Sequence, residues 1–195
     1  MRRHRLVTFD GDDTLWELAP VIERALSVLC GVFARAIPGA TVTLEELTAD
    51  RLAAEQELPP GSSMLAYRRA ALRRRVDLLG GGPDVLVDEL LARFQTLRSS
   101  LIEPYPDALG TLQRLRAYAV LGVISNGNAN VELTPFRGCF AFCLHAFVHG
   151  PEKPEVGMFS DALAQTGLHA GAAVHVGDSL VHDVAGARAA GWRSV

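Results

Sequence analysis

The chain has 195 residues, of which 49% are hydrophobic and 21% charged, so it is long enough for one folded domain with a modest insertion. A formal net charge of -3 does not favour a nucleic-acid surface, and the sequence has no apolar run of about 18 residues that could span a membrane. Three cysteines argue against a disulfide framework, and the apolar stretch before Asp10 is too short for a signal-peptide core, so we expect a cytoplasmic protein.

The first predicted element is a short buried strand that ends in acidic residues. Apolar or β-branched residues fill 6–9, and Asp10, Asp12 and Asp13 follow around Gly11. Residues two apart in an extended chain point the same way, so the carboxylates of Asp10 and Asp12 can face one small volume. Clustered carboxylates repel unless a cation lies between them, and a divalent ion with oxygen ligands is the usual one. The stretch predicts a metal site; the alternative is a solvated acidic turn.

A block of helices is predicted next, without a strand signal. Apolar periodicity, a capping box that opens at Thr43, and breaks at proline and glycine define the helices. They cover residues 18–37, 43–58, 62–79 and 83–97. The arginines at 68, 69 and 73–75 are expected on a solvated face of the third helix; in the alternative reading, one of them reaches into a cleft to meet an anionic substrate.

Strands and helices alternate from Asp107 onward. Helices are predicted at 107–115, 155–166 and 180–190, and strands at 120–124, 143–148, 173–176 and 192–195. With the strand at 6–9, this alternation predicts an α/β fold, in which a Rossmann-like parallel sheet is covered by helices. Residues 1–16 and 104–195 would form this core, and residues 17–103 an inserted α-helical domain.

Right-handed crossovers should bring the carboxyl ends of all the parallel strands to one rim of the sheet. That rim is where ligands bind in open α/β sheets. We therefore expect Asp10, Ser125, Lys153 and Asp178 to lie close together although they are far apart in the sequence.

Four short motifs follow the predicted strands in order. They are FDGDDT at 9–14, ISN at 124–126, KP at 153–154 and GDSLVHD at 177–183. Each motif alone is a weak signal, but four in this order are specific. In these motifs the sequence resembles the haloacid dehalogenase superfamily over essentially the whole chain. The helical block lies where members with an α-helical (C1-type) cap carry that cap.

The resemblance implies a Mg²⁺-dependent phosphatase that works through an aspartyl-phosphate. Asp10 would be the nucleophile, and Asp12 the acid that protonates the leaving oxygen and later the base that activates water. Lys153 would stabilise charge on Asp10 and on the phosphoryl oxygens. Ser125 and the backbone amide of Asn126 would hold the phosphoryl group by hydrogen bonds.

The resemblance also implies a magnesium-ligand set and its supports. The metal ligands would be the carboxylates of Asp10 and Asp178 and the backbone carbonyl of Asp12. Asp183 would support the metal or orient Lys153. Thr14 would hold the first loop by a backbone hydrogen bond. Members of the superfamily usually carry one more strand or helix after the segment that ends this sequence.

Asp12 favours the phosphatase branch over the dehalogenases. Dehalogenases of this superfamily lack an acid at the second position, because a halide leaves without a proton. A 2-haloacid dehalogenase, a phosphonatase or phosphomutase of the same fold, and a non-catalytic scaffold are the alternatives. The expected partner is a small phosphorylated metabolite, such as a sugar phosphate, a nucleotide or phosphoglycolate. Neither a nucleic acid nor a membrane is expected as a partner, and the protein should be a monomer or a homodimer.

A second cluster of possible metal ligands lies near residue 145. Cys139, Cys143, His145 and His149 form the pattern C-x3-C-x-H-x3-H. This spacing does not match common zinc-ligand sets, and most of the segment is expected in a strand. We therefore expect a packed strand here rather than a zinc site.

Overall fold

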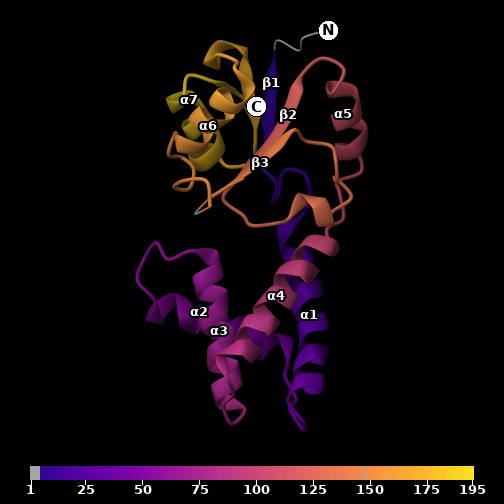
Figure 1. Cartoon of the computed structure of the whole chain (residues 1–195), viewed down its shortest axis with the longest axis vertical. Coiled ribbons are helices and arrows are strands. Elements are labelled where there is room, and N and C mark those ends of the chain that lie inside the picture. The colour runs from indigo at the N-terminus through magenta and orange to yellow at the C-terminus, as the bar shows by residue number, and fades with distance from the viewer. Residues whose placement is uncertain (1–4, 147) are drawn as a thin grey trace. The chain divides into compact units, whose positions relative to one another are not determined.

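The structure is a computed structural model that describes residues 5–146 and 148–195, and Figure 1 shows its elements. A parallel five-stranded sheet has the order β3-β2-β1-β4-β5. The strands are β1 (Leu6–Phe9), β2 (Val120–Ser125), β3 (Phe142–His145), β4 (Ala173–Val176) and β5 (Arg193–Ser194). The prediction of a parallel α/β sheet is confirmed.

Helices cover both faces of the sheet. In Figure 1, α5 (Ala108–Leu115) lies on one side, and α6 (Gly157–Thr166) and α7 (Gly186–Ala189) lie on the other. β1 is the central strand and is buried, because apolar neighbours cover both of its faces. Short 3-10 turns, η1 (Val131–Leu133) and η2 (Ala170–Ala172), complete the connections. The arrangement leaves the carboxyl ends of β1, β2 and β4 next to one another at one rim.

β3 is shorter than the predicted strand at 143–148. The chain turns back after His145, whose carbonyl oxygen accepts a hydrogen bond from the backbone N–H of His149 at 3.0 Å. The imidazole Nδ1 of His149 also accepts the backbone N–H of His145 at 3.0 Å. Phe147, within the predicted strand, lies outside the described residues. The strand ends early because its last polar groups are used by this turn.

The predicted helix at 180–190 begins as a wider helix. Its first part, η3 (Leu180–Ala185), is π-helical, and the N–H of Val184 reaches the carbonyl oxygen of Ser179 at 3.1 Å. The hydroxyl of Ser179 caps this turn by accepting the N–H of His182 at 3.1 Å. α6 begins at Gly157, two residues later than predicted.

A separate set of helices comes from the middle of the chain: α1 (Leu18–Ala36), α2 (Leu44–Glu57), α3 (Met64–Leu78) and α4 (Asp84–Ser100). Packing divides the chain into one unit of residues up to Leu18 and from Ile102 onward, and a second unit of Ala19–Leu101. The predicted insertion, 17–103, differs from the second unit by two residues at each end. The capping box of Thr43 and Glu46 is present at the start of α2. Within the described part of the chain, no helix has both the length and the apolarity needed to cross a bilayer.

The predicted solvated face of arginines on α3 is wrong for Arg75. Arg75 is only 7% exposed, and its guanidinium donates to Asp50 at 2.7 Å and to Glu46 at 2.8 Å, both on α2. Arg68 is partly buried as well, with its guanidinium carbon 4.4 Å from the ring centre of Phe94. Periodicity alone did not predict this, because the acidic partners come from another helix.

Candidate active site

A pocket of about 260 Å³ opens at the rim where β1, β2 and β4 end. Its lining brings together residues from four separate segments of the sequence. They are Asp10, Asp12, Asp13, Asn126, Gly127, Lys153, Asp178, Ser179, His182 and Asp183. The lining includes five aspartates and one lysine, so it is strongly negative when its carboxylates are ionised. Such a pocket favours a bound cation.

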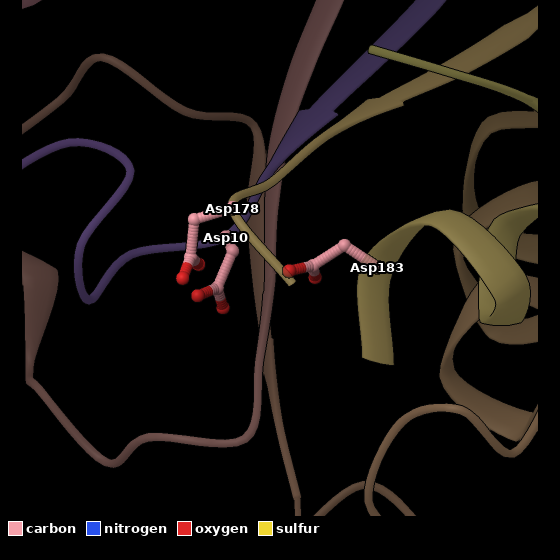
Figure 2. Close-up of side chains that lie close together, drawn as sticks. All are labelled: Asp10, Asp178 and Asp183. Atoms are coloured by element: carbon pink, nitrogen blue, oxygen red, sulfur yellow. The ribbon is translucent and has the colours of Figure 1, made fainter. Parts of the chain in front are cut away.

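Three of these aspartates are close enough to share an ion. One carboxylate oxygen from each of Asp10, Asp178 and Asp183 lies within 4.8 Å of the other two. Figure 2 shows Asp10 and Asp178 side by side where their strands end, with Asp183 reaching toward them from the helix that follows β4. Hard carboxylate oxygens are the ligands that Mg²⁺ prefers. The residues present therefore fit a magnesium ion.

Lys153 is buried against this cluster, with 1% of its surface exposed. Its Nζ donates to Oδ1 of Asp10 at 2.8 Å, to Oδ1 of Asp183 at 2.5 Å and to the carbonyl oxygen of Ile124 at 2.8 Å. An ammonium has three N–H donors, so protein oxygens use all of them. A phosphoryl oxygen can approach this ammonium only by sharing or replacing one of these bonds.

The carboxylate of Asp183 is held from three directions. Oδ1 accepts from Lys153 and from Nε2 of His175 at 2.9 Å, while Oδ2 accepts the backbone N–H of Ser179 at 3.0 Å. Burial alone would raise the pKa of Asp183, but the hydrogen bond from His175 and the charge and hydrogen bond of Lys153 outweigh it and lower this pKa to about 2. These three hydrogen bonds fix the position of the Asp183 carboxylate beside Lys153.

The loop after β1 folds tightly around an indole ring. A Cβ atom on Gly11 would lie 2.6 Å from Cη2 of Trp16, so only glycine fits there. Asp13 has a positive φ of 59°, and its Oδ1 accepts the N–H of Leu18 at 2.9 Å at the start of α1. The indole N–H of Trp16 donates to Oδ1 of Asp12 at 2.9 Å. This contact holds the carboxylate of Asp12 at the wall of the pocket.

Thr14 and Asp178 contact each other across the rim. The hydroxyl of Thr14 accepts the backbone N–H of Asp178 at 3.1 Å and lies 3.4 Å from its Oδ1. Thr14 thus ties the loop after β1 to the loop after β4.

The end of β2 supports the lysine loop. The side-chain amide of Asn126 donates to the carbonyl oxygen of Lys153 at 3.0 Å, and its oxygen accepts the N–H of Lys153 at 2.7 Å. The hydroxyl of Ser125, which is buried, accepts the N–H of Gly127 at 3.0 Å. Asn126 and Gly127 line the pocket. This pair of hydrogen bonds between the side chain of Asn126 and the backbone of Lys153 was not predicted.

Sequence reasoning missed two histidines at this site. His175 lies within β4 and contacts Asp183, and His182 lines the pocket from η3. A polar residue inside the apolar run at 173–176 was the available signal for His175. For His182, the only signal in the sequence was its position inside the motif at 177–183.

The structure does not bring Cys139, Cys143, His145 and His149 together as one group of possible metal ligands. Within the described ranges, the only group of three or more possible ligands close enough to hold an ion is the aspartate cluster. Burial raises the pKa of the Cys143 thiol to about 11, and the charge of Glu132 raises it further. Cys143 and His145 lie in β3, so the predicted strand is confirmed as far as His145.

Comparison with known protein families identifies the fold. The model of the haloacid dehalogenase-like hydrolases matches residues 4–191. The chain belongs to this family. In this haloacid dehalogenase-like hydrolase, each of the four short motifs given above contributes at least one residue to the lining of the pocket.

Individual relatives of this hydrolase have different names. It is 28% identical to glyceraldehyde 3-phosphate phosphatase of Methanopyrus kandleri, over 98% of this chain and 82% of that protein. It is 27% identical to phosphoserine phosphatase of Thermus thermophilus, over 98% of this chain and 87% of that protein. A solved structure of 2-haloacid dehalogenase from Pseudomonas syringae pv. Tomato DC3000 is 38% identical with a TM-score of 0.82, over 97% of this chain and 84% of that chain.

Proposed function

We propose that this chain is a Mg²⁺-dependent phosphatase of small phosphate monoesters. The observation that carries the proposal is that Asp10 and a second acid, Asp12, line one pocket in which Lys153 donates to Asp10. The curated relatives named as phosphatases support the same reaction class. The size of the pocket, about 260 Å³, suits a small substrate.

In the first half-reaction, a carboxylate oxygen of Asp10 attacks phosphorus. The bond from phosphorus to the ester oxygen breaks, and Asp12 gives its proton to the leaving oxygen. Lys153 holds one oxygen of Asp10 by a hydrogen bond, so the nucleophile is oriented before the substrate arrives. The products are an alcohol and an aspartyl-phosphate.

In the second half-reaction, water hydrolyses the aspartyl-phosphate. Asp12, now a carboxylate, accepts a proton from the water as its oxygen attacks phosphorus, and the bond to Asp10 breaks. Phosphate is released, and both aspartates return to their starting forms. The indole N–H of Trp16 keeps Asp12 at the pocket during both halves.

Asp10, Asp178 and the backbone carbonyl of Asp12 would hold Mg²⁺. The ion supplies charge stabilisation for the phosphoryl oxygens. Thr14 contributes by fixing the position of Asp178. Asp183 holds Lys153 instead of the metal, because its carboxylate already accepts three hydrogen bonds.

A dehalogenase is the second candidate, favoured by the likeness to the Pseudomonas syringae structure. In that reaction, Asp10 would displace halide from carbon, and the halide would need no proton. The two functions therefore differ in their dependence on Asp12.

The test measures phosphate release from an aryl phosphate and a panel of phosphorylated metabolites, and halide release from 2-haloacids. We expect Mg²⁺-dependent phosphate release that Asp10→Asn abolishes and Asp12→Asn lowers by about 10²–10⁴-fold. Asp161→Asn, which removes an exposed carboxylate outside the pocket, should keep wild-type activity. Halide release that survives Asp12→Asn, without phosphate release, would assign the dehalogenase. No turnover in either assay would favour a scaffold.

A further inference from the structure

A line of buried polar residues runs beneath the catalytic lysine. Thr8 on β1 and His175 on β4 are register partners in the sheet, and neither is exposed to solvent. His175 leads to Asp183, which is 1% exposed, and Asp183 leads to Lys153. Polar side chains inside a sheet are destabilising unless they are paired. Here each residue of the series is hydrogen-bonded to the next, from Thr8 through His175 and Asp183 to Lys153.

The partners of His175 define which ring nitrogen carries the proton. Nε2 lies 2.9 Å from Oδ1 of Asp183, and Nδ1 lies 2.8 Å from the hydroxyl oxygen of Thr8. An ionised carboxylate only accepts hydrogen bonds, so Nε2 must be the donor. A neutral ring then accepts at Nδ1, and Thr8 is the donor there. The carboxylate of Asp183 therefore selects the tautomer with hydrogen at Nε2, and the hydroxyl of Thr8 supports this tautomer by donating to Nδ1.

We propose that His175 is a positioning residue, which fixes the carboxylate of Asp183 and so keeps the ammonium of Lys153 against Asp10. This inference rests on the proposed function. His175 donates to the same oxygen of Asp183 that accepts from Lys153. Without that bond the carboxylate can rotate about the remaining contacts, and the ammonium moves with it. Small displacements of a catalytic group lower turnover strongly.

A purely structural role for His175 is the competing explanation. The ring packs edge-on against Phe159, with 5.2 Å between ring centres and an interplanar angle of 88°. If His175 only fills space, the hydrogen-bonding capacity of its partners should not affect catalysis. Matched substitutions separate the two explanations, because Thr8→Val keeps the shape of the side chain and removes its hydroxyl, while Thr8→Ser keeps the hydroxyl.

The sequence offers a direct probe of the lysine. Lys153 is the only lysine among the 195 residues. Protein made with lysine carrying ¹³C at Cε and ¹⁵N at Nζ therefore gives a single lysine side-chain resonance in the full chain. This resonance reports on the surroundings of the Lys153 ammonium and does not require turnover. It is recorded together with kcat and KM for an aryl phosphate.

We expect Thr8→Val and His175→Leu to shift the Lys153 resonance and to lower kcat by about 10–100-fold, with KM changed by less than about twofold. Thr8→Ser, and His175→Gln with its amide donor near the position of Nε2, should recover most of kcat. Phe159→Leu, which disturbs packing alone, should lower the Tm and leave the resonance in place.

Two results would overturn the proposal. One is an unchanged resonance and kcat in folded Thr8→Val; the other is an equal loss of kcat in both members of each matched pair. If His175→Leu fails to fold, the Thr8 pair still decides, because its members differ little in volume. Failure of the proposed function is seen separately, as wild-type activity in Asp10→Asn, and leaves the resonance test intact.

Discussion

The Nζ atom of Lys153 lies 2.5 Å from Oδ1 of Asp183, and each residue is only 1% exposed. Removing the ammonium would leave Asp183 and Asp10 buried without their cation. We expect Lys153→Met to lower the free energy of unfolding by about 3–5 kcal/mol, measured by urea denaturation. Adding Asp183→Asn should recover part of the loss, since it removes the unpaired charge. A loss below about 1 kcal/mol would show that the pair does not stabilise the fold.

Gly177 allows the close approach of Asp183. A Cβ atom at Gly177 would lie 2.2 Å from Cγ of Asp183, so Gly177→Ala must displace that carboxylate. We expect a loss of about 1–3 kcal/mol in unfolding free energy, together with reduced phosphatase turnover. Gly110→Ala is the matched control, because its Cβ meets only the end of the Arg114 side chain at 3.5 Å within α5. That substitution should stabilise by about 0.5–1 kcal/mol. Equal effects of the two changes would contradict the steric argument.

The stability of the protein should fall in mildly acidic solution. Burial lowers the pKa of His175, and the positive charge of Lys153 lowers it further. The hydrogen bond and charge of Asp183 and the charge of Asp10 act in the opposite direction, but the net effect is a lowered pKa. The unfolded chain therefore takes up a proton at this histidine near pH 6.5, while the folded chain does so only at a lower pH. Stability from this group is complete above about pH 6.5 and is lost below it, by up to about 1.4 kcal/mol per pH unit.

Urea denaturation between pH 7.5 and 5.5 measures this dependence. Comparison with His175→Gln isolates the contribution of His175 from that of the other histidines, because glutamine does not titrate. The wild-type slope should exceed that of the variant. Identical slopes would mean that His175 is protonated alike in the folded and unfolded chains.

Mg²⁺ should stabilise the folded protein through Asp178. A ligand that binds only the folded state adds about 2.7 kcal/mol at 100 times its Kd. We expect the Tm to rise with added Mg²⁺ in the wild type and in Asp161→Asn, which loses the same charge at an exposed position outside the pocket. Asp178→Asn should show no rise. A normal Mg²⁺ response in Asp178→Asn would remove this residue from the metal site.

The second unit should depend on the buried arginine of α3. Arg75 and Asp50 form an ion pair at 2.7 Å with side chains 9% and 4% exposed. Arg75→Met leaves Asp50 buried without its main partner, and we expect a loss of about 3–5 kcal/mol in thermal or urea unfolding of the full chain. Arg69→Met, which breaks an exposed pair with Asp88, should change little. A comparable loss in both variants would show that burial does not set the strength of these pairs.

The residues at the rim could be predicted because the local sequence marks where each strand ends. Asp10, Ser125 and Asp178 each come at or just after the end of an apolar run, and parallel topology requires these ends to share an edge. His175 was not found, since its hydrogen-bond partner Thr8 is 167 positions away and lies inside the neighbouring strand. The pairing exists only once the register of the sheet is known.

Two further details, the π-helix at 180–185 and the burial of Arg75, could not be predicted from the sequence pattern alone. Periodicity over residues 180–185 does not distinguish a π-helix from an α-helix, because six residues make little more than one turn of either. The burial of Arg75 likewise required knowledge of the neighbouring helix, since an arginine on a helix surface is usually solvated. Long-range partners thus explain most of what sequence patterns left open.

The central place of β1 has a consequence for synthesis on the ribosome. Leu6 pairs with Val120 on one side and with Ala173 on the other, so β1 must wait for partners that are translated much later. The helices of residues 19–101 are complete before either partner exists. The nascent chain can therefore bury its helical segment early, while β1 stays an unpaired apolar segment open to chaperones until β2 and β4 have been synthesised.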